Sequence, residues 1–97
     1  MTHTAPPRLN SAMAAFMNQE ADVPFATNIS LALTVAEKLQ TLGYTFKLKD
    51  LCPKDIEHDN WAAIFTDEQG TLVRQEHENA ATAICRAAFA ILSTPRQ

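Results

Sequence analysis

The stretch AATAICRAAFAIL, residues 80–92, places one arginine and one cysteine in an otherwise apolar segment. At about 100° per residue, its small and aliphatic side chains fall on one broad side of a helix. Asn79 can cap the free amides at its start, and Pro95 ends the helix after about residue 93. We therefore predict a buried closing helix in which Cys85 is a small core residue rather than a nucleophile.

The opposite side of this helix contains Thr82, Arg86, Phe89 and Ser93. An aromatic ring facing water is unexpected on a helix whose other side is already apolar. One interpretation is that Phe89 meets another surface and that Arg86 offers its bidentate guanidinium to a carboxylate there. The alternative is a solvated arginine beside one exposed ring, which is ordinary on protein surfaces.

Apolar residues that follow the N-terminal prolines recur at helical spacing and predict a short amphipathic helix. Its Met13, Phe16 and Met17 side chains either pack on the core or belong to a partner surface, because methionine adapts its shape to what it meets. Together with Arg86 and Phe89, these three residues form the candidate interface.

A second helix and three extended segments lie between these two helices. Residues 28–43 have the strongest helical pattern, with Thr27 or Asn28 as cap and Gly43 at the end. Apolar and polar residues alternate over 44–51, as in a half-buried strand. Residues 61–65 and about 71–75 flank the turn sequence DEQG, and odd-numbered residues of 61–65 share one face. The helix is predicted to bury Ile29, Ala32, Leu33, Ala36 and Leu39.

These elements predict an α+β domain of order α-α-β-β-β-α, with an antiparallel three-stranded sheet sandwiched by helices. The chain has 97 residues, 46% of them hydrophobic and 20% charged, which suits one domain with one core. We assign residues 8–94 to that domain and residues 1–7, with their two consecutive prolines, to a disordered arm.

Charge and cysteine content restrict the function. The formal net charge is −3, which disfavours nucleic acid as a partner, and the small cluster of Lys47, Lys49 and Lys54 is predicted to be a solvated strand face. No segment has the length of a membrane span or the pattern of a signal peptide, so we expect a cytoplasmic protein. Cys52 and Cys85 are then expected to be free thiols.

The order of helix, strand, WAAIF strand, polar gap and closing ATAICRAAF helix resembles the phage ABA sandwich domain, a group of small phage and prophage proteins. Its members commonly end in a helix of the type AICRAA, which occupies residues 83–88 here. The resemblance covers roughly residues 27–92. It implies an antiparallel sheet held between helices, an origin in phage or mobile-element DNA and no established catalytic activity, and it assigns no functional residues.

We therefore expect a non-catalytic, cofactor-free protein that forms homo-oligomers or binds another phage or host protein. The alternative is a metal-binding protein or metal-dependent enzyme, because histidine and carboxylate side chains bind zinc and transfer protons. Against it, neither HxxxH nor HxH spacing occurs, and acidic residues at a helix start also favour the helix dipole. The candidate ligands are His58, Asp59, Glu76 and His77, with Glu78 beside them.

Overall fold

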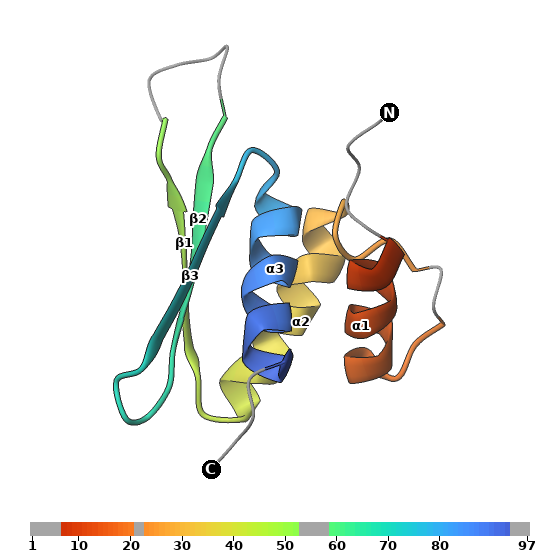
Figure 1. The fold of residues 1–97 in the computed structure, drawn as a ribbon, viewed down its shortest axis with the longest axis horizontal. Helices are drawn as coiled ribbons and strands as arrows, with labels where there is room; N and C mark the ends of the chain where they lie inside the picture. Colours follow the sequence, from red (N-terminus) through yellow and green to blue (C-terminus); the bar gives the residue numbers. More distant parts are fainter. Residues whose placement is uncertain (1–6, 21–22, 53–58, 94–97) are drawn as a thin grey trace.

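The computed structural model describes residues 7–20, 23–52 and 59–93. The order of elements is α-α-β-β-β-α, and the strands form one antiparallel sheet in the order β1-β2-β3 (Figure 1). The predicted α+β class, strand number and element order are confirmed. The elements are α1 (Pro7–Met17), α2 (Ile29–Thr41), β1 (Thr45–Asp50), β2 (Trp61–Thr66), β3 (Leu72–His77) and α3 (Ala80–Ser93).

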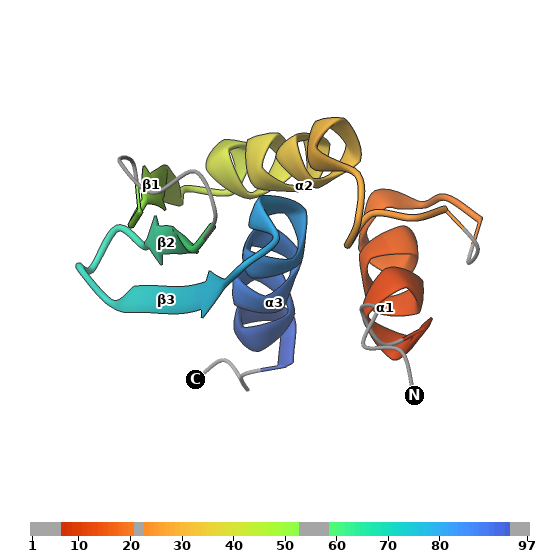
Figure 2. The same cartoon turned by 90° about the horizontal axis from the view of Figure 1, so that it is seen from above.

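All three helices lie on the same side of the sheet (Figures 1 and 2). The sheet forms the first layer, α2 and α3 form the second, and α1 packs on the far side of that helix pair. The arrangement therefore differs from a sheet held between helices on both faces. One face of the sheet is covered, and no described helix or strand lies over the other.

Local sequence features set the ends of these elements. The Asn28 side chain accepts a hydrogen bond from the Leu31 amide at the start of α2, and Asn79 does the same for the Ala81 amide at the start of α3. Gly43 follows α2 with a φ of +107°, a left-handed angle that suits glycine. The third strand extends to His77, beyond the predicted end at residue 75, because His77 still pairs with Trp61.

Helix α3 is buried around most of its circumference, since the sheet, α2 and α1 all pack against it. The prediction that the side with Thr82, Arg86, Phe89 and Ser93 faces outward is therefore partly wrong. Thr82 is only 3% exposed, and its hydroxyl donates a hydrogen bond to the Ala26 carbonyl at 2.6 Å. The segment between α1 and α2 covers this side of α3, and Arg86 and Ser93 remain exposed.

Replacing Thr82 with valine is expected to lower the free energy of unfolding by about 1–3 kcal/mol. Valine has a similar shape but leaves the Ala26 carbonyl without its donor in a buried place. Midpoints of urea denaturation measure the change. The control is Thr34→Val, because Thr34 donates to the Leu31 carbonyl within its own helix. Equal losses in both variants would contradict the role given to Thr82.

The buried side of α2 is rotated relative to the prediction. Ile29 is 42% exposed and Leu33 is 39% exposed, whereas Val35 is fully buried. Ala32, Ala36 and Leu39 are buried as predicted. The difference arises because α2 packs mainly against α3 and only lightly against β1, so one side of its broad apolar surface stays in water.

Candidate binding surface

Of the candidate interface residues, Met13 has no exposed surface and belongs to the hydrophobic core. Its assignment to a partner surface is wrong for this fold, because α1 packs against α3 of the same chain. Phe89, Phe16 and Met17 are half-buried and pack against the same core. Arg86 is exposed. The apolar residues of the first helix are therefore used mainly in packing within the chain.

Phe16 is also held by a lysine from α2. The Lys38 ammonium lies 4.6 Å from the centre of the Phe16 ring and donates a hydrogen bond to the Phe16 carbonyl at 2.5 Å. This carbonyl belongs to the last turn of α1, where a cation is favoured by the helix dipole. The contact fixes α1 against α2 and makes the Phe16 ring part of the fold.

The candidate metal ligands that the structure describes are not brought together. Glu76 and His77 are neighbours in β3, so their side chains point to opposite faces of the sheet. Asp59 is exposed, and His58 lies outside the described residues. Among the residues that the structure describes, no three histidine, cysteine, aspartate or glutamate side chains are grouped as metal ligands would be. The His77 ring instead accepts a hydrogen bond from the Asn79 amide.

Cys85 lies in the core beside Ile84, as predicted from its place on the closing helix. Burial removes water from the thiolate and raises the pKa of this thiol to about 12. The group therefore stays protonated at neutral pH, and a thiol in this state is a poor nucleophile.

The raised pKa of Cys85 makes the fold sensitive to alkali. The folded thiol keeps its proton above the ordinary pKa of 9.0, while the unfolded thiol loses it. The stabilisation is complete below pH 9.0 and is lost as the pH rises towards 12, by about 1.4 kcal/mol per pH unit. Urea midpoints measured across this interval should fall more steeply for the natural chain than for Cys85→Ala. An equal fall of the urea midpoint with pH in both proteins would refute the raised pKa of Cys85.

The uncovered side of the sheet, which we call the outer face, consists of three rows of residues that lie side by side across the strands. In the central row, Ile64 of β2 lies between Lys47 of β1 and Arg74 of β3. The alternation of side chains is confirmed, because Ala63 and Phe65 belong to the core under the helices and Ile64 does not. The flanking rows are Thr45, Thr66 and Leu72 at one end and Lys49, Ala62 and Glu76 at the other.

The centre of the outer face is apolar, and two of its three rows have charged residues on β1 and β3, whereas the row of Thr45, Thr66 and the exposed Leu72 is uncharged. Ala62 has no exposed area, and Ile64 is half-buried. Lys49 and Glu76 flank Ala62 in the register, and long side chains of this kind cover apolar neighbours with their aliphatic stems. At the β3 margin, Arg74 forms an ion pair with Glu76.

The sequence predicted that the lysines of this face share one side of a strand, but it did not predict which residues of the other strands lie beside them. Alternation over residues 44–51 placed Lys47 and Lys49 on one side of a strand. Arg74 and Ile64 join them only through the register of β1, β2 and β3. That the helices leave this side uncovered is a property of the packing, and no pattern in the sequence marked it.

Comparison of the chain with protein-family models, with curated proteins and with solved structures finds no match. Among the described helices, none combines the length and the apolar character that a membrane crossing requires.

Proposed function

We propose that this is a non-catalytic binding module, of the phage or prophage kind, that engages another protein through the outer face. The observation that carries the proposal is the position of Ile64 at the centre of a sheet surface that no described element covers. An apolar centre within a polar margin is the usual composition of a protein-binding surface. The AICRAA pattern of the closing helix supports the phage assignment.

The non-catalytic character is supported by the state of the reactive groups. Cys85 is buried as a neutral thiol, and Glu76 is engaged with Arg74 rather than with His77. Against the metal-site alternative, Glu76 and His77 face opposite sides of the sheet and so do not bind one ion together.

A second copy of the chain is the other possible occupant of the outer face. Two copies packed face to face bring two sets of cations together, since Lys47, Lys49 and Arg74 outnumber Glu76. Like charges opposed across an interface are unfavourable. The geometry therefore favours a different protein over a homo-oligomer.

The test is enrichment of short random peptides from a displayed library on the immobilised chain, followed by binding to two variants. Ile64→Glu places a charge at the centre of the outer face. Ile29→Glu makes the same change on the exposed side of α2, at a helix start where a carboxylate is tolerated.

Enriched peptides are expected to bind Ile64→Glu about tenfold more weakly than the natural chain, a loss of about 1.4 kcal/mol in binding free energy. Their affinity for Ile29→Glu is expected to equal that for the natural chain. Two results would overturn the proposal: no enrichment above an inert protein, or peptides that bind all three chains equally. Light scattering on the same chains measures self-association. A dimer that Ile64→Glu alone dissociates would make the second copy the partner.

A further inference from the structure

The outer face has a charge opposite to that of the chain as a whole. It contains three cations, Lys47, Lys49 and Arg74, and one anion, Glu76, which gives a net charge of +2 (three less one). The complete chain has a formal net charge of −3. The negative charge of the protein is therefore concentrated away from this face, and the field in front of the sheet attracts anionic groups.

The four charges of the outer face differ in their availability. Glu76 is neutralised by Arg74 and also accepts a hydrogen bond from the Asn60 side chain at 3.4 Å. Within the described part of the chain, Lys47 and Lys49 form neither an ion pair nor a side-chain hydrogen bond, and both are exposed. The two ammonium groups are thus available to a partner.

We infer that the partner of the outer face is an acidic protein segment in an extended conformation, with carboxylates for Lys47 and Lys49 and an apolar side chain for Ile64. The inference rests on the proposed function and specifies its ligand. Lys47 and Lys49 lie two residues apart on one strand, so their Cα atoms are separated by about 6.6–6.8 Å. Carboxylates at alternate positions of an extended segment have the same spacing.

A nucleic acid fits this face less well. Neutralising a phosphate backbone takes many basic groups, and this face offers three on a chain of negative net charge. Ile64, at the centre, offers an apolar contact that a phosphate backbone does not use.

Lysines on an edge strand also discourage pairing between sheets of different molecules, and that role requires no acidic ligand.

The experiment takes the peptides enriched on the natural chain and compares their affinity for that chain with their affinity for two charge-reversed variants. Lys47→Glu with Lys49→Glu reverses the β1 margin, and Arg86→Glu reverses an exposed cation on α3. Circular dichroism checks that each variant is folded, and the double Lys→Gln variant repeats the test without introducing negative charge. A labelled DNA duplex and a labelled RNA duplex are titrated in parallel.

Acid-rich peptides are expected, with binding about tenfold weaker to the double lysine variant, unchanged for Arg86→Glu and weaker in high salt. Peptides that depend on Ile64 but contain no excess of acidic residues would overturn the inference and leave the proposed function standing. Absence of any peptide that depends on Ile64 would overturn the proposed function itself. Binding of either duplex that the lysine reversal abolishes would assign the face to nucleic acid instead.

Discussion

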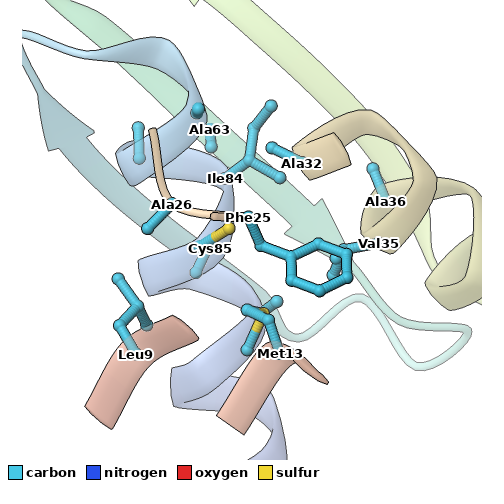
Figure 3. Packing of buried hydrophobic residues seen from close by; sticks show 14 of the residues in the cluster. Leu9, Met13, Phe25, Ala26, Ala32, Val35, Ala36, Ala63, Ile84 and Cys85 are labelled. Atoms are coloured by element: carbon cyan, nitrogen blue, oxygen red, sulfur yellow. The ribbon is translucent and has the colours of Figure 1, made fainter. Parts of the chain in front are cut away.

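Replacing Phe25 with alanine is expected to lower the free energy of unfolding by about 3–5 kcal/mol, the largest single effect that we predict. Phe25 is 1% exposed and is among the largest fully buried side chains of the protein. Figure 3 shows it in one cluster with Met13 of α1, Val35 of α2 and Cys85 of α3. Removal of the ring leaves a cavity where three helices meet.

The backbone beside Phe25 is fixed, which limits how far such a cavity can collapse. The Ala26 amide donates a hydrogen bond to the Asn10 side chain at 2.9 Å, and the Ala26 carbonyl accepts one from Thr82 at 2.6 Å. The segment is thus held from α1 on one side and from α3 on the other. A residual cavity adds to the cost of losing apolar contact.

Urea denaturation followed by circular dichroism measures the effect of Phe25→Ala. Leu42→Ala is the control, because Leu42 is 58% exposed and its truncation is expected to cost less than about 0.5 kcal/mol. A loss below about 1 kcal/mol for Phe25→Ala would contradict the packing of this segment between the helices.

Replacing Met13 with alanine is the second large effect, an expected loss of about 2–5 kcal/mol. Met13 is fully buried between α1 and the rest of the core, so the loss arises within one molecule. The stability of the variant is therefore expected to be independent of protein concentration. Had Met13 been at a subunit interface, the stability would depend on protein concentration, because association stabilises the folded state by mass action.

Met17→Ala is the matched control for Met13→Ala. Both residues are methionines of α1, but Met17 is half-buried at the end of the helix. The smaller area buried by Met17 predicts a smaller loss. Denaturation midpoints at several protein concentrations, together with light scattering, distinguish the two locations. Equal losses, or a midpoint for Met13→Ala that moves with concentration, would place Met13 at an interface.

Sequence patterns predicted the elements because the responsible interactions are short in range. Asn28 and Asn79 cap helices that begin one residue later, and Gly43 follows the helix it was predicted to end. Alternation along residues 61–65 correctly assigned Ala63 and Phe65 to the covered face. Each of these features depends on neighbours within about four residues, so the order of residues was sufficient to find it.

The burial of side chains on the helices was predicted less well. Phe25 lies in the segment between α1 and α2, outside every predicted helix and strand, and it is nevertheless in the core. Ile29 was placed on the buried stripe of α2 and is exposed, while Thr82 was placed outside and is buried. Periodicity gives the width of an apolar surface, and it does not tell which neighbour covers it.

The sequence by itself determined the α+β class, the order of the six elements, their caps and the alternation of the strands, because hydrogen bonds and side-chain periodicity over a few residues set these features. Only the tertiary structure decided that the helices cover one face of the sheet and that Met13 is internal. It also decided that Lys47, Ile64 and Arg74 lie in one row. These properties depend on contacts between residues far apart in the chain, and a local pattern has no information about them.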